Sequence, residues 1–161
     1  MYVDPTLDKK HRLGINSFYK AHYPRTAELY ADWRTYAFLR LLGNHSLSLQ
    51  METLLKPVLI AVFCHPKAEF TTLQQLFTLE ANDPVFQKII ASAPDITQNF
   101  LKGEFHSNFY ARTKSSLYSR LQHFMNYSVL HQLFNGKQTV DIGKELAQGK
   151  SLLINISKSN L

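Results

Sequence analysis

Several residue types that would indicate particular protein classes are scarce in this sequence. Its one cysteine, Cys64, excludes a disulfide within the chain and fits a reducing compartment. Only 6 glycines and 6 prolines occur among 161 residues, which argues against disorder and against β architectures with many turns. The longest apolar run, residues 57–64, is far shorter than the roughly 20 residues that a bilayer requires, and residues 1–20 contain no apolar core of a signal peptide.

The charge balance is moderately basic. The net charge is +6. Residues 1–80 contain nine Lys and Arg against seven Asp and Glu, a net +2, and residues 81–161 contain nine against five, a net +4. A basic excess is compatible with nucleic acid or with an acidic partner, and equally with an ordinary solvated surface. The length fits one domain with its own hydrophobic core.

Hydrophobic spacing predicts two long helices. The first covers residues 26–42, where Leu29, Trp33 and Tyr36 recur at intervals of four and three residues. The second covers residues 47–65 and contains Pro57, for which we expect a kink and not a break. Because this second helix is apolar on nearly all sides after Pro57, we expect it to be the most buried element.

Shorter elements follow. Cap and spacing signals predict further helices over 73–79 (capped by Thr71 or Thr72), 85–91 (capped by Asn82-Asp83, with Pro84 in the first turn), 96–105, 113–125 and 129–134. In the helix over 113–125 the side chains expected to face inward are Leu117, Leu121, Phe124 and Met125. Residues 1–5 and 151–157 are strand-like. The predicted fold is therefore mainly α, a helical bundle of two long and several short helices with a minor strand pair formed by the chain ends.

One segment nearly matches a phosphate-binding loop. Residues 143–151 read GKELAQGKS, with five residues between the glycines where the P-loop has four. The context is also reversed, because a P-loop follows a strand and opens a helix. Here a helix-like stretch precedes Gly149-Lys150 and a strand-like stretch follows it. We interpret this pair as a turn into a buried strand.

No catalytic or metal site is predicted from the remaining residues. His123 and His131 are eight residues apart and do not form an HExxH motif, and Cys64 has no second cysteine as a co-ligand. Asp95 and Glu104 are nine residues apart and make no convincing acid–base pair.

The best functional candidates are cations interleaved with aromatic residues between positions 102 and 120. Cations neutralise phosphates, and aromatic rings stack on exposed bases. The bland alternative is that Phe109 and Tyr118 pack inward while the cations only keep the surface solvated. The predicted nucleic-acid or substrate contacts are Lys102, Arg112, Lys114, Tyr118 and Arg120.

The C-terminal part of the chain carries a resemblance to a known family. The residues concerned are Tyr118-Ser-Arg120-Leu121, Val140-Asp141-Ile142 and, above all, the passage from Gly149-Lys150 to Asn155-Ile-Ser157-Lys158. This run resembles conjugative DNA-transfer ATPases, the coupling proteins of type IV secretion in the FtsK/HerA-like P-loop superfamily. Residues 2–16 and the helical middle are similar to the same family, with less distinctive motifs.

The resemblance implies a specific place in a larger protein. In that family this region is an all-α domain inserted into a RecA-like motor, so residues 1–161 are expected to be a single domain excised from it, with motor strand edges at about 1–5 and 151–157. The chain contains neither a Walker A nor a Walker B motif, and Asn155 stands where a catalytic acid would be needed. No nucleotide-binding residue is therefore transferred. We expect no enzyme activity and no cofactor in this chain, ATP and Mg²⁺ belonging to the parent.

The partners and location are likewise implied by the resemblance. They are a relaxase–DNA complex or another secretion substrate, and the rest of a hexameric parent ATPase. The domain would be cytoplasmic without direct membrane contact, while the parent would be anchored in the inner or plasma membrane. The alternative function is a free-standing basic helical nucleic-acid-binding module.

Overall fold

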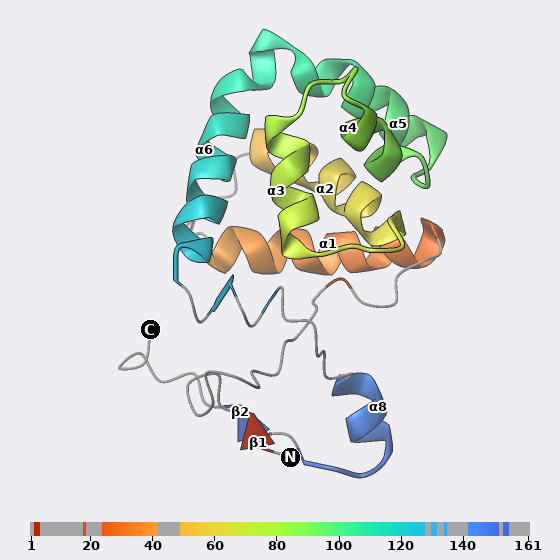
Figure 1. Cartoon of the computed structure of the whole chain (residues 1–161), viewed down its shortest axis with the longest axis vertical. Helices are drawn as coiled ribbons and strands as arrows, with labels where there is room; N and C mark the ends of the chain where they lie inside the picture. Colours follow the sequence, from red (N-terminus) through yellow and green to blue (C-terminus); the bar gives the residue numbers. More distant parts are fainter. Residues whose placement is uncertain are drawn as a thin grey trace.

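The computed structural model describes residues 2–3, 18, 24–41, 49–127, 130–131, 134, 142–151 and 153–154. In chain order the elements are β1 (Tyr2–Val3), α1 (Pro24–Leu41), α2 (Leu49–Cys64), α3 (Phe70–Thr78), α4 (Pro84–Ile90), α5 (Asp95–Lys102), the 3₁₀ turn η1 (Glu104–His106), α6 (Asn108–Met125), α8 (Ile142–Ala147) and β2 (Leu153–Ile154). Figure 1 shows α1 to α6 gathered into one body, with α8 and the two strands below it. The prediction of a mainly α fold is confirmed.

Helix α2 is the centre of the helical body. It contacts α1, α3, α4, α5 and α6, and every residue from Val58 to Cys64 is buried. Burial of a side chain as large as valine, leucine, isoleucine or phenylalanine contributes roughly 1.5–3 kcal/mol to stability. The helix runs through Pro57 without a break, although proline has no N–H to donate to the Thr53 carbonyl. The prediction that this helix is the most buried element is confirmed.

Helix α1 packs on α2 through small side chains. Ala27 and Ala31 are fully buried, and Thr35 and Phe38 continue the same face at four- and three-residue intervals. Alanine lets the two helix backbones approach closely, which explains why this helix pair shares the most extensive contact among the described elements. Beyond the alanines, Phe38 enters an aromatic cluster, with its ring centroid 5.8 Å from that of Phe70.

The residues whose spacing predicts α1 do not face the core. Leu29, Trp33 and Tyr36 are 58%, 71% and 51% exposed. At 100° per residue they lie roughly opposite to the two buried alanines. The helix itself is predicted correctly, over 24–41 against the expected 26–42, of which Leu42 lies outside the described residues. The apolar spacing that is typical of a buried helix face here marks the solvent face.

The helix starts between residues 69 and 84 show one correction and one confirmation. The N-cap of α3 is Glu69, not Thr71 or Thr72, and its backbone N–H donates to Oγ1 of Thr72 at 3.2 Å. Thr72 thus acts from the first turn of the helix. Asp83 caps α4 as predicted: Oδ1 accepts from the backbone N–H of Val85 at 2.7 Å, and Pro84 occupies the first turn.

Helix α6 begins five residues earlier than the sequence predicts. Its first residue is Asn108, where we expected the helix to start at Thr113. The preceding segment, predicted as one helix over 96–105, is divided at Gly103 into α5 and η1. On the inner face of α6, Leu117, Leu121 and Met125 are buried as predicted. Tyr110 and Thr113 extend that face toward the N-terminus; the side chain of Phe124, also expected inside, lies outside the described residues.

The GKELAQGKS segment forms a helix end. The N–H of Gly149 donates to the Leu146 carbonyl at 2.9 Å, and that of Lys150 donates to the Glu145 carbonyl at 3.2 Å. These two bonds, with Gly149 at a φ of +75°, are the Schellman arrangement that ends α8. Nζ of Lys150 also lies 2.7 Å from Oε2 of Glu145. The lysine is bound to its own helix, and the interpretation of Gly149-Lys150 as a turn is confirmed. The expectation that the following strand is buried is wrong at Leu153, which is 66% exposed.

The extended segments near the chain ends are short in the described residues. Tyr2 and Val3 pair in parallel with Leu153 and Ile154. Residues 1, 4–5, 152 and 155–157 of the predicted strands lie outside the described part, as do most residues of the expected 129–134 helix. Two residues per strand are too few to establish a sheet, so the strand pair stays a prediction.

Candidate nucleic-acid interface

Helix α6 carries cations and no carboxylate. Its 18 residues include Arg112, Lys114 and Arg120 but neither Asp nor Glu. Arg112 and Arg120 lie within about 80° of each other around the helix axis, and about 12 Å apart along it. Since successive phosphates of one DNA strand advance by about 3.4 Å along the duplex axis, the two guanidinium groups are spaced to contact different phosphates.

Aromatic and hydroxyl side chains lie on the same side of α6 as these arginines. Phe109 is 65% exposed, although the neighbouring Tyr110 is buried. Tyr127, just beyond the helix end, is exposed and meets the ring of His123 edge-on, with centroids 5.8 Å apart. The side of the helix that we call the outer face of α6 comprises Phe109, Arg112, Ser116, Arg120, His123 and the adjoining Tyr127.

The five predicted contact residues do not form one surface. Lys114 lies about 160° around α6 from Arg112, and Tyr118 follows one turn after Lys114 on that opposite flank. Tyr118 is partly buried against the core. Lys102 lies at the end of α5, where its Nζ donates to Oε1 of Gln98 at 3.2 Å. The structure therefore brings Arg112 and Arg120 together and places the other three elsewhere.

Lys114 packs into a cluster of side chains from three elements. Its Nζ lies 4.2 Å from the centre of the Phe105 ring, a cation–π geometry. The next residue of η1, His106, meets the rings of Phe86 and Phe105 edge-on at 5.2 and 5.1 Å. Burial lowers the pKa of Lys114, and the negative charge of Glu80 acts in the opposite direction. Lys114 is therefore held by contacts within the chain, away from Arg112 and Arg120.

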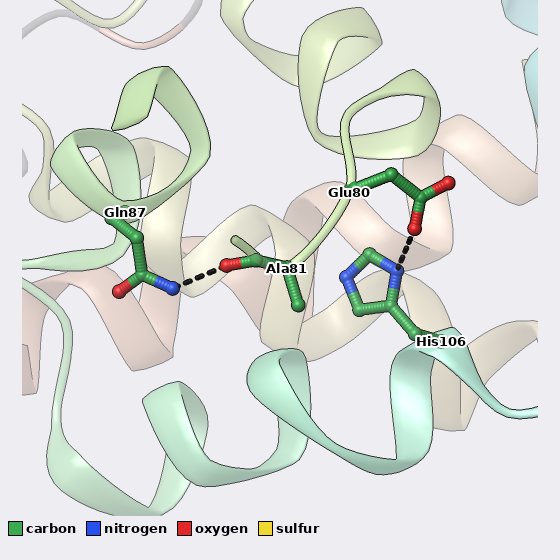
Figure 2. Close-up of polar contacts among 4 residues, drawn as sticks. All are labelled: Glu80, Ala81, Gln87 and His106. Carbon is green, nitrogen blue, oxygen red and sulfur yellow. Dashed lines mark hydrogen bonds and ion pairs between the residues drawn. The ribbon is translucent and has the colours of Figure 1, made fainter. Parts of the chain in front are cut away.

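His106 lies beneath the loop that joins α3 to α4. Figure 2 shows Nδ1 of the imidazole pointing to Glu80, at 3.9 Å from Oε2, and the other ring nitrogen on the side of Ala81. That nitrogen, Nε2, is buried without a hydrogen-bond partner among the residues that the structure describes. Gln87 fastens the same loop, because its Nε2 donates to the Ala81 carbonyl.

The pKa of His106 is lowered, first by burial and then by the positive charge of Lys114, while Glu80 raises it. An imidazole held by a carboxylate is a frequent general-base arrangement. Here the nitrogen that would have to exchange a proton with a substrate is closed off from solvent. We therefore interpret the His106–Glu80 contact as a fastening of the α3–α4 loop.

The sequence reasoning missed three members of the outer face, Ser116, His123 and Tyr127. His123 entered only as a candidate zinc ligand. Counting onward from Arg112 in steps of four, four and three residues reaches Ser116, Arg120 and His123, and four more reach Tyr127. Helical spacing from one arginine could therefore have found these residues, whereas simple nearness in sequence selected Lys114 and Tyr118.

The described residues provide neither a metal-binding cluster nor a membrane-spanning helix. No group of three or more His, Cys, Asp or Glu side chains gathers there in an arrangement that could hold a metal ion. None of the helices in the described part combines the length and the hydropathy that a membrane span requires.

Comparison with known proteins adds no relative. No family model matches the chain, and no curated protein or solved structure matches it significantly. The resemblance to coupling proteins of type IV secretion therefore stays a prediction from the residues quoted above.

Proposed function

We propose that this chain is a docking domain for nucleic acid or a nucleoprotein substrate, and that the outer face of α6 makes the contact. The observation that carries the proposal is the composition of that face: two arginines and a histidine between exposed aromatic rings, on an 18-residue helix without a carboxylate. Arginine contacts phosphate with a bidentate fork, and each such contact releases counterions from the nucleic acid.

The sequence resemblance supplies the biological setting of the proposal. As a helical domain of a coupling protein, the chain would receive a relaxase–DNA complex or another secretion substrate at the cytoplasmic mouth of a hexameric motor. It would orient that substrate without hydrolysing nucleotide, since ATP turnover belongs to the motor part of such a protein. Incubation of the purified chain with ATP and Mg²⁺ should accordingly release no phosphate above the buffer rate.

The alternative is a free-standing basic helical nucleic-acid-binding module. The two functions differ in how the chain binds by itself. A self-sufficient module should hold duplex DNA tightly with a steep dependence on salt. A docking domain should bind DNA weakly alone and more tightly when the protein component of its substrate is present.

The contact surface can be tested by fluorescence anisotropy with labelled single-stranded and duplex DNA at several salt concentrations. Replacing Arg112 and Arg120 by alanine together should weaken binding and reduce the slope of log K against log salt by about 2. The control is Lys88→Ala, which removes one positive charge from the exposed surface of α4, as each single arginine variant does from α6. Equal losses in the control and the double variant would contradict the assignment to α6.

Lys114→Ala tests the sequence prediction separately. Because Lys114 lies on the opposite flank and over the Phe105 ring, we expect this variant to bind DNA as the unmodified chain does. A larger loss for Lys114→Ala than for Arg112→Ala, with the helical circular dichroism unchanged, would move the contact to the other flank of α6.

A further inference from the structure

Helix α1 presents a second exposed surface, which is apolar and unrelated to α6. Leu29, Trp33 and Tyr36 follow each other at intervals of four and three residues on the side opposite to the buried alanines. Tyr30 borders them: its ring centroid is 6.0 Å from that of Trp33 and 5.9 Å from that of Phe63. We call Leu29, Tyr30, Trp33 and Tyr36 the α1 aromatic face.

Charge is confined to the edge of this face. Asp32 lies on the flank nearest α2, where its Oδ1 is 2.6 Å from Nζ of Lys56. That pairing compensates the carboxylate within the chain. Between Leu29 and Tyr36 no charged residue of α1 points in the direction of this face, whereas Arg25 and Arg40 occupy the same side of the helix one turn beyond its two ends. An apolar partner surface could therefore cover the face without burying an unpaired charge.

The size of the face defines what kind of association it can support. The four side chains together expose about 450 Å² when their exposed fractions are applied to the 150–250 Å² of large side chains. That is the size of the largest apolar patches on monomeric proteins, which are often functional. Two such faces pressed together would bury roughly 900 Å², just below the roughly 1,000 Å² expected of a specific interface.

The arrangement along α1 is self-complementary. Trp33 lies between Leu29 and Tyr36, four residues from one and three from the other. If a second α1 approaches in the antiparallel direction, Trp33 meets Trp33 at the two-fold axis, and each Leu29 meets a Tyr36. A two-fold pair repeats the same patch on both copies in this way, and tryptophan and tyrosine are the residues that dominate such contacts.

We propose that the α1 aromatic face binds the same face of a second copy of this chain, forming a weak, antiparallel, two-fold symmetric dimer. Because the estimated area lies below that of stable interfaces, the dimer dissociates on dilution. This inference stands apart from the proposed docking function, because no residue of the outer face of α6 takes part in it.

The experiment uses the only tryptophan of the chain as its reporter. Trp33 is 71% exposed in the single copy, so burial in a dimer should shift its fluorescence emission to shorter wavelength. We expect sedimentation equilibrium to show a reversible monomer–dimer equilibrium, and the emission shift to follow the dimer fraction as the concentration rises.

Two variants with the same type of substitution distinguish association through the α1 aromatic face from nonspecific hydrophobic association. Leu29→Glu places a charge in the α1 aromatic face and keeps the tryptophan reporter; it should raise the dissociation constant at least tenfold. Ile96→Glu changes an equally prominent apolar residue, 79% exposed on α5, and should leave the dissociation constant unchanged. Circular dichroism checks that both variants retain the helical fold.

Three outcomes overturn the proposal. The first is a monomer at every concentration with emission typical of exposed tryptophan. The second is a monomer whose emission is already shifted to short wavelength, which would mean that the face is covered within one chain. The third is an association that Leu29→Glu leaves intact or that Ile96→Glu weakens equally. DNA binding by the α6 variants is measured independently, so either proposal can fail alone.

Discussion

Helices α1 and α6 have the same length, 18 residues, and both pack on α2, yet they present opposite surfaces to solvent. The inner face of α1 is built on two alanines, whereas that of α6 is built on Leu117, Leu121 and Met125. Close packing on these alanines leaves no space beside them for Leu29, Trp33 and Tyr36, which lie outside. On α6 the inner side chains are large, and the outer face combines arginine, histidine and serine with the exposed ring of Phe109. The contact with the core thus decides what each helix can offer a partner.

The largest expected effect comes from removing a large inner side chain of α6. Leu121 is 1% exposed, and Leu121→Ala should lower the free energy of unfolding by about 3 kcal/mol because it leaves a cavity. Urea denaturation measures the change. Ser119→Ala, on the exposed side of the same helix, is the control and should change stability by less than about 0.5 kcal/mol. A loss of less than about 1 kcal/mol for Leu121→Ala would show that α6 packs loosely.

In α1 the informative substitution goes from a small to a large side chain, because the interface between α1 and α2 has no space for added volume. Ala31 is fully buried against the core, and Ala31→Leu should lower the free energy of unfolding by about 2 kcal/mol through overpacking. Ala111→Leu makes the same substitution at an exposed position of α6 and should be neutral. If Ala31→Leu proved neutral as well, the close approach of α1 and α2 would be refuted.

A smaller effect, with the opposite sign, is expected at Thr35 on the inner face of α1. Its Oγ1 is buried and has no hydrogen-bond partner within the described part of the chain, so Thr35→Val removes an unsatisfied hydroxyl at constant shape. The free energy of unfolding should rise by about 1 kcal/mol. The contrasting variant is Thr72→Val: Thr72 is also buried, but it accepts the Glu69 N–H, and its loss should be destabilising. Equal signs for the two variants would contradict this assignment.

The stability of the chain should depend on pH through His106, a residue of η1 that lies near Lys114 of α6. Burial and the charge of Lys114 hold its pKa below the ordinary value of 6.5, so the unfolded chain binds the proton more readily than the folded chain. The stability contributed by neutral His106 is complete above pH 6.5 and is lost as the pH falls below it. His65, whose pKa burial also lowers, acts in the same direction. The difference between the unmodified chain and His106→Gln, measured by urea denaturation from pH 8 to 5, isolates His106. A constant difference over that range would refute the prediction.

The smallest effect is expected at the most prominent side chain of α1. Trp33→Ser exchanges two residues of similar helix propensity at a solvent-exposed position. In dilute solution, where any dimer has dissociated, the free energy of unfolding should change by less than about 0.5 kcal/mol. Measured by circular dichroism, a loss above about 2 kcal/mol would show that Trp33 belongs to the core and would reverse the comparison of the two helices.

The sequence predicts the helices of this chain better than it predicts their inner faces. The start of α4 is predicted because Asp83 and Pro84 act locally, through a cap bond within two residues. The burial of α2 is predicted because its apolar run leaves no polar side after Pro57. The orientation of α1 could not be predicted in this way. Spacing identifies an apolar stripe, but whether Leu29 and Trp33 or Ala27 and Ala31 face α2 depends on the space that α2 leaves.

The candidate site shows the same limit. Arg112 and Arg120 were selected from the sequence and share one side of α6, whereas Lys114 is drawn to the ring of Phe105, a residue of another element. No pattern in the sequence around Lys114 predicts that contact. The near P-loop, in contrast, is resolved by local rules, because Gly149 closes α8 through backbone bonds within five residues.

The single cysteine has a use that follows from its position at the end of the central helix. Cys64 is 4% exposed, and burial raises the pKa of its thiol, so thiolate is scarce and reagents do not reach the sulfur in the closed state. The rate of thiol labelling under native conditions therefore measures how often the C-terminal end of α2 opens to solvent. The unmodified chain thus carries two natural probes. Trp33 reports association at the surface, and Cys64 reports local opening of the core.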